Sequence, residues 1–135
     1  MTRADGERGS AAVELVVLAP VFMMLLAFVV LVGRVQASRA DVEGVAHSAA
    51  RSITLSRTPE DAANDAQAAA EASLRVGSAT CRSMGWSVAL SDEEVTVTIS
   101  CTIDLAAASI LPVPATQTVS ASSTEVIDRF REGGA

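Results

Sequence analysis

The chain has little of what nucleic-acid-binding and metal-binding proteins use. Its 135 residues include three Phe, one Trp and no Tyr, so stacking platforms for nucleic-acid bases are missing. Ten basic and sixteen acidic side chains leave a net charge of −6, which repels phosphate backbones. Two cysteines and one histidine are too few for a structural zinc cage of four ligands. We therefore expect no nucleic-acid partner, no metal and no other cofactor.

Motifs for catalysis are also missing. No serine stands in a nucleophile-elbow motif, and the glycines, which are scattered along the chain, form no phosphate loop. His47 is the single histidine, and we expect it to be packed or solvated and not to act as a ligand or general base. The sequence therefore predicts no catalytic residue and no enzyme.

Charge is absent from residues 15–32, an unbroken apolar run of eighteen residues. As a helix this run is about 27 Å long, close to the thickness of the hydrocarbon core of a bilayer. A buried core helix of a small domain would show a polar face, and this run has none. We therefore expect a transmembrane helix over 10–33, with Pro20 removing one backbone donor and kinking or loosening the helix.

A lone carboxylate, Glu14, lies at the start of this run, five residues after Gly9. An ionised side chain in a membrane calls for a partner. If the chain were cut after Gly9, the new amine of Ser10 would lie one helical turn from Glu14 and could neutralise it, within one subunit or between two. The alternative is that the Glu14 side chain extends to the lipid headgroups, where its charge costs little free energy.

The segment Arg8-Gly9-Ser10-Ala11-Ala12-Val13-Glu14-Leu15, followed by Leu18-Ala19-Pro20, resembles the processing site and first helix of the TadE-like family. These are minor pilins, or pseudopilins, of the tight-adherence (Flp-type) pilus machinery. The resemblance implies cleavage between Gly9 and Ser10 by a prepilin peptidase, a leader at 1–9, and assembly with other pilins through an inner-membrane platform. Major Flp pilins carry Tyr after the Glu, whereas Leu15 follows here, which favours a minor subunit.

A secretory signal is the second interpretation of this N-terminal segment. Val35-Gln36-Ala37 precedes Ser38 as a small-residue cleavage site, and cleavage there would release a binding domain unrelated to pili. Against it, the apolar run is longer than the usual signal core, and the leader side chains sum to zero charge. Cleavage after Gly9 or after Ala37 stays open from the sequence.

Two further helices are predicted after the apolar run. Apolar residues at one-sided spacing predict an amphipathic stalk over 34–57, continuous with the transmembrane helix; they are Val35, Val42, Val45, Ala46, Ala49 and Ile53. Thr58-Pro59-Glu60-Asp61 predicts a second helix with Thr58 as N-cap and Asp61 completing a capping box. This Ala-rich helix ends at Gly77 and either packs on the stalk or lies on the surface.

The rest of the chain is predicted to form a sheet. Residues 95–105 alternate apolar and polar without a break, as a half-buried strand does. The acidic loop Ser91-Asp92-Glu93-Glu94 sets Leu90 opposite Val95, so that position 84 faces Cys101. A solvated turn explains these acids as well as a calcium site does. Residues 116–127 predict a third, edge-like strand.

Cys81 is three residues out of line with Cys101 in this register, so a disulfide between them needs a bend in the chain. Two cysteines beyond a membrane span still favour one disulfide, in an oxidising compartment, over two buried free thiols. The predicted fold is therefore α+β and pilin-like, with a head over 58–135, about three antiparallel strands and a frayed tail. We expect a single-pass protein of the cytoplasmic membrane with its N-terminus cytoplasmic, its head extracytoplasmic, and lipid among its partners.

Overall fold

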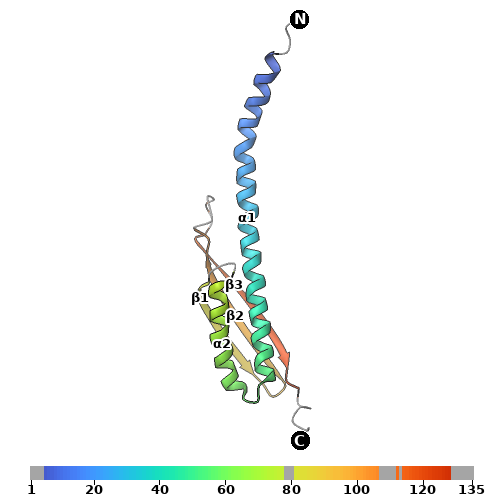
Figure 1. Ribbon diagram of the computed structural model, residues 1–135, viewed down its shortest axis with the longest axis vertical. Helices are drawn as coiled ribbons and strands as arrows, with labels where there is room; N and C mark the ends of the chain where they lie inside the picture. The colour runs from blue at the N-terminus through green and yellow to red at the C-terminus, as the bar shows by residue number, and fades with distance from the viewer. Residues whose placement is uncertain (1–4, 78–80, 107–111, 113, 129–135) are drawn as a thin grey trace.

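The computed structural model describes residues 5–77, 81–106, 112 and 114–128, with side chains from residue 12 onward. Helix α1 (Asp5–Leu55) is followed by helix α2 (Pro59–Val76) and strands β1 (Cys81–Leu90), β2 (Glu94–Asp104) and β3 (Thr116–Val126). The upper part of α1 projects from a small head in which both helices lie against the sheet (Figure 1). The predicted α+β architecture with three antiparallel strands is confirmed.

Helix α1 is a single 51-residue helix that serves two environments. Along its first half, from Val13 to Val30, the large apolar side chains are exposed, from 45% at Leu18 to 72% at Val16. Along its second half the residues at helical spacing are buried against the head: Val42, Ala46, Ala49, Ala50 and Ile53. The stalk predicted from residue spacing is therefore confirmed, and it is continuous with the apolar segment.

Helix α2 packs on α1 through alanines. Its buried residues are Ala66, Ala70 and Leu74, and small side chains at such positions let two helix backbones approach closely. Of the two alternatives left open by the sequence, packing on the stalk is thus the correct one. The helix ends at Val76, with Gly77 as the predicted C-terminal cap.

The predicted capping box at the start of α2 is wrong. Thr58 is the N-cap residue, but its side chain makes no capping hydrogen bond. The hydroxyl of Ser56 interacts locally instead: it accepts a 3.3 Å hydrogen bond from the backbone N–H of Thr58. Pro59 has no backbone N–H, so the first turn of α2 has one amide fewer that needs a partner.

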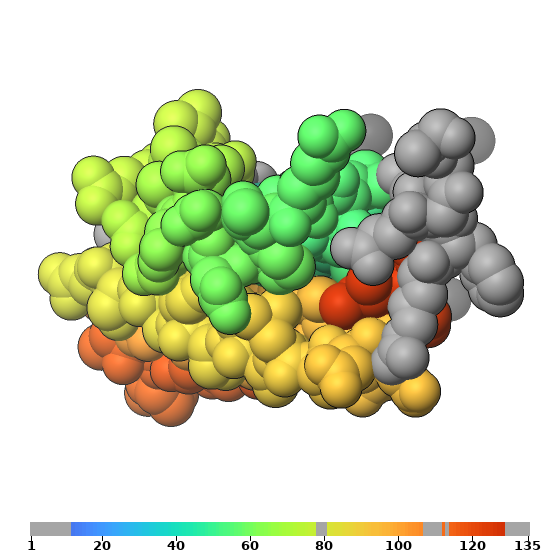
Figure 2. All heavy atoms as spheres, turned by 90° about the horizontal axis from the view of Figure 1, so that it is seen from below, coloured from blue at the N-terminus to red at the C-terminus, as the bar shows by residue number. Residues whose placement is uncertain are grey.

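The sheet has the strand order β1-β2-β3, with both neighbouring pairs antiparallel. Leu90 pairs with Val95 and Met84 with Cys101, as the loop length predicted. The predicted inner face of β2 is buried throughout, at Val95, Val97, Ile99, Cys101 and Ile103, and Leu105 beyond the strand is buried too. Seen from below, the helices form one layer and the strands the other (Figure 2). The core lies between these layers.

The outer face of the sheet carries hydroxyl groups in register. Thr96 and Thr124 lie side by side with their hydroxyls 2.8 Å apart, and Thr98 donates a 3.2 Å hydrogen bond to Ser122. The third strand is an edge, as predicted. The predicted frayed tail, residues 130–135, lies outside the described residues.

Candidate functional site

The predicted processing site lies near the start of α1. The helix begins at Asp5, so the backbone of Gly9 and Ser10 is helical. Glu14 follows Ser10 by four residues, which is one helical turn, and it is exposed. No described residue forms an ion pair with its carboxylate. The geometry therefore leaves Glu14 accessible to a cation from another chain or to the amine that cleavage would create at Ser10.

The surface around Glu14 is apolar. Val13 is 66% and Leu15 69% exposed, and the described helix from Ala12 is long and apolar enough to cross a membrane. A signal sequence near an N-terminus has a similar length and composition. A core helix would be mostly buried, and this segment is not. An exposed surface of this kind is stable only when lipid or other apolar helices cover it.

Pro20 lies inside α1 without interrupting it, because the helix is continuous from Asp5 to Leu55. Figure 1 shows the upper part of α1 as one curved helix. The predicted local kink at Pro20 stays a prediction. In lipid, the carbonyl freed by a proline needs a partner from a neighbouring helix or from local adjustment of the backbone.

The junction between the apolar segment and the head lies within the same helix. Ser38 is 2% exposed, and its hydroxyl donates a 2.8 Å hydrogen bond to the carbonyl of Arg34. Val42 is buried one turn further on. The alternative cleavage bond, Ala37–Ser38, is therefore inside a helix that continues for many residues on both sides.

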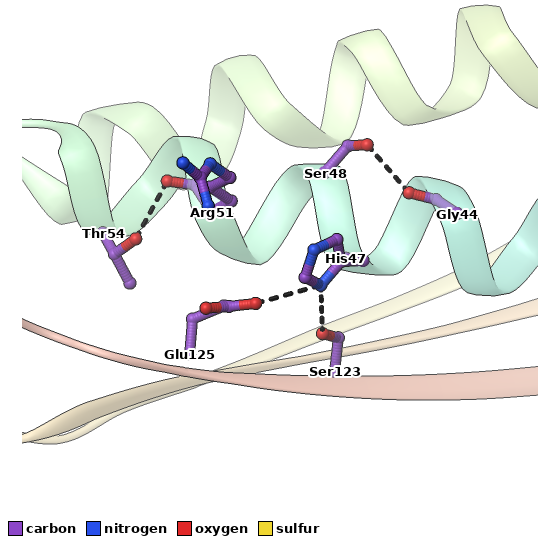
Figure 3. Close-up of polar contacts among 7 residues, drawn as sticks. All are labelled: Gly44, His47, Ser48, Arg51, Thr54, Ser123 and Glu125. Carbon is purple, nitrogen blue, oxygen red and sulfur yellow. Dashed lines mark hydrogen bonds and ion pairs between the residues drawn. The ribbon is translucent and has the colours of Figure 1, made fainter.

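His47 links α1 to β3, a contact that the sequence did not predict. Its Nδ1 lies 2.9 Å from Oε1 of Glu125 and 3.5 Å from the hydroxyl of Ser123. Figure 3 shows the imidazole directed from α1 toward the strand. Both contacts use Nδ1, and they join α1 to β3.

Cys81 and Cys101 form the disulfide that the sequence favoured. The bend it requires is a break in strand register between Cys81 and Ser83. Next to it, Arg82 forms a 3.3 Å ion pair with Asp104. The disulfide and the ion pair both join β1 to β2 at one end of the sheet. Strand β3 begins at the same end.

An open groove of about 610 Å³ runs between α1 and α2. Its walls consist mainly of small residues, among them Ala40, Gly44, Ser48, Ala69 and Ser73. Within the part of the chain that the structure describes, no group of three or more His, Cys, Asp or Glu is placed to hold a metal ion. The acidic residues 92–94 are exposed at the turn between β1 and β2.

Comparison with known proteins relates the first part of the chain to a family. Residues 9–51 match the family model described as TadE-like protein. This range begins at Gly9, includes Glu14 and Pro20, and ends within the part of α1 that packs in the head. No curated protein and no solved structure matches the chain.

Proposed function

We propose, from the TadE-like match of residues 9–51, that this chain is a minor pilin or pseudopilin of a tight-adherence (Flp-type) pilus or a related secretion apparatus. The family match connects the chain with such pilus systems in general. We propose further that the chain is a minor subunit, that it is cleaved after Gly9, that other pilins are its partners, and that its N-terminus is cytoplasmic. In this proposal the apolar half of α1 holds the subunit in the cytoplasmic membrane until assembly.

The observation that carries the proposal is that one continuous helix forms both the exposed apolar rod and part of the core of the head. Val16 and Leu25 are exposed on this helix, while Ala46 and Ile53 of the same helix are fully buried under the sheet. A force applied to the rod is therefore transmitted to the head through continuous backbone hydrogen bonds and not through a flexible linker. A subunit that is drawn from a membrane into a fibre needs this coupling.

Glu14 supplies specificity in the proposal. The apolar surface around Glu14 packs about equally well against lipid and against a neighbouring helix. Apolar contacts alone therefore do not fix the position of one helix along another. A single carboxylate that must meet a single amine does fix this position, because leaving either charge unpaired in the apolar layer is costly. The amine is that of Ser10, produced when a prepilin peptidase cleaves after Gly9.

A membrane-anchored or secreted binding domain is the alternative. It would need cleavage after Ala37, or an anchor with no role beyond attachment. Cleavage there would cut α1 and remove Leu31 and Val35 from contact with the core. The helical environment of Ser38 supports the pilin proposal over cleavage after Ala37.

The test is the mature N-terminus together with one substitution. Intact mass of the natively isolated protein gives a start at Ser10 under the proposal, at Ser38 if the alternative is a secreted domain, and at Met1 if it is an anchored one. Glu14→Ala should abolish co-isolation with the other pilins of the system, while the matched variant Glu43→Ala, which removes an exposed acid from the head part of α1, should not. A start at Ser38 would refute the proposal, and unchanged co-isolation of Glu14→Ala would remove the role assigned to Glu14.

A further inference from the structure

The two edge strands of the sheet, β1 and β3, are free of charge over most of their lengths. Residues 83–90 of β1 and 116–124 of β3 contain no charged side chain, in a chain whose net charge is −6. No described strand pairs with either outer edge. Proteins usually protect exposed edges with charges, prolines or bulges, because an unprotected edge pairs with other strands. Here the register break near Cys81 and the charge of Arg82 protect one end of β1, and the rest is unprotected.

The directions of the strands decide which edges can meet. β1 and β3 both run antiparallel to β2, so they run parallel to each other. Both therefore run away from the end of the head that is nearer the apolar half of α1 (Figure 1). Pairing of two β3 edges in antiparallel fashion would point the two α1 helices in opposite directions. Two copies anchored in one membrane cannot meet in this way.

We propose that β3 of one copy pairs in parallel with β1 of a second copy anchored in the same membrane. This inference rests on the proposed membrane-anchored pilin function and extends it to a specific contact between heads. The contact is heterologous, because each copy offers β1 to one neighbour and β3 to the other, and contacts of this type continue into rings or filaments. Backbone hydrogen bonds between the edges supply the attraction.

The proposed contact has a defined register. Within one copy, Ser87, Thr98 and Ser122 lie in one row across the sheet. In the proposed contact this row continues from one copy into the next, so Ser122 of one copy comes to lie next to Ser87 of the other. All the residues of this row carry hydroxyl groups on the outer face, and no like charges are brought together by the contact.

Cysteine cross-linking tests the contact in membranes of cells that express the full chain. The variant Ser87→Cys/Ser122→Cys places two thiols in one row, separated within a copy by two strand spacings, roughly 9.5 Å. A disulfide needs Cα atoms about 4.4–6.8 Å apart, so the two new thiols cannot bond within one copy. Mild oxidation should give a ladder of oligomers on a non-reducing gel, and peptide mass mapping should identify a disulfide that joins position 87 of one copy to position 122 of another.

Three matched variants control this experiment. Ser87→Cys alone and Ser122→Cys alone should stay monomeric, because a heterologous contact needs one thiol from each edge. Ala68→Cys/Ser122→Cys, with one thiol on the exposed face of α2, should also stay monomeric. Adding Thr118→Lys and Ser120→Lys to the cross-linking variant should reduce the ladder to the level of the single variants, because charge on an edge opposes pairing.

Two outcomes would overturn the inference. One is a cross-linking variant that stays monomeric while Trp86 fluorescence shows a folded head. The other is a single-cysteine variant that cross-links as efficiently as the double variant, since that indicates a symmetric contact. If the ladder is absent while Glu14-dependent co-isolation with other pilins persists, only the edge contact fails. If both are absent, the proposed pilin function fails with it.

Discussion

Cys81 pairs in register with Ile103, yet its Cα is only 5.5 Å from that of Cys101, two residues further back along β2. The register break between Cys81 and Ser83 produces this approach, because it moves the end of β1 relative to the rest of the strand. The disulfide thus holds the bulged end of an edge strand to the centre of the sheet. The result is a closed loop that contains nearly all of the β1–β2 hairpin.

Removal of this disulfide should destabilise the head. Because it closes a loop of about 20 residues, the loss in Cys81→Ala/Cys101→Ala should be about 3 kcal/mol in the chain-entropy model. Urea unfolding of the detergent-solubilised chain, followed by the fluorescence of Trp86, its single tryptophan, measures this difference. The reduced wild-type protein is the control and should lose a similar amount. An unchanged midpoint in both would show that the bond contributes nothing to stability.

The end of α1 allows a matched test of the core. Ile53 is fully buried, whereas Leu55, two residues later, is 54% exposed. Ile53→Ala should cost roughly 2–5 kcal/mol, because it removes buried methyl groups and leaves a cavity under the sheet. Leu55→Ala should cost less than about 1 kcal/mol. Equal losses in the two variants, measured by the same unfolding experiment, would contradict the assignment of the α1 face that enters the core.

The features that the sequence predicted correctly are those that depend on local pattern. The alternation from Val95 to Leu105 determined the buried face of β2, and the short loop after Leu90 determined the hairpin register. The apolar spacing around Ala46 determined the face of the stalk. In each case a periodicity of one element was enough, because the element buries a single face.

The features that the sequence did not predict depend on relations between distant or competing groups. His47 meets Ser123 across 76 positions of sequence, and neither residue lies in a motif. The predicted capping box does not form, because the hydroxyl of Ser56, two residues before Thr58, accepts the hydrogen bond of the Thr58 backbone N–H. The bulge at Cys81 was required by the disulfide but not visible in the strand pattern. Glu14 was recognised as a lone carboxylate at the start of the apolar run, Gly9 and Ser10 were assigned to a processing site through the family resemblance, and the roles of all three stay predictions.

Gly85 and Ser100 should be energetically coupled. They pair across β1 and β2, and a Cβ added at Gly85 would collide with the hydroxyl of Ser100. Gly85→Ala should therefore stabilise the head by about 0.5–1 kcal/mol in a Ser100→Ala background, where the strand gains the usual advantage of alanine over glycine. In the wild-type background the gain should be smaller, because the Ser100 side chain must first rotate. An equal gain in both backgrounds would show that the two side chains do not interact.

The contact of His47 with Glu125 should contribute little to stability despite its 2.9 Å distance. The side chain of His47 is 61% exposed, and exposed pairs of this kind contribute about 0.2–1 kcal/mol. A double-mutant cycle of His47→Ala and Glu125→Ala, measured by urea unfolding at low salt, should give a coupling energy in this range. The exposed pair Glu71 and Arg75, 3.8 Å apart on α2, provides the comparison and should couple more weakly, because its charged groups are farther apart and more exposed. A coupling well above 1 kcal/mol at His47 would mean that water is excluded from the contact and that β3 is held to α1 mainly by this pair and not by the burial of Val119.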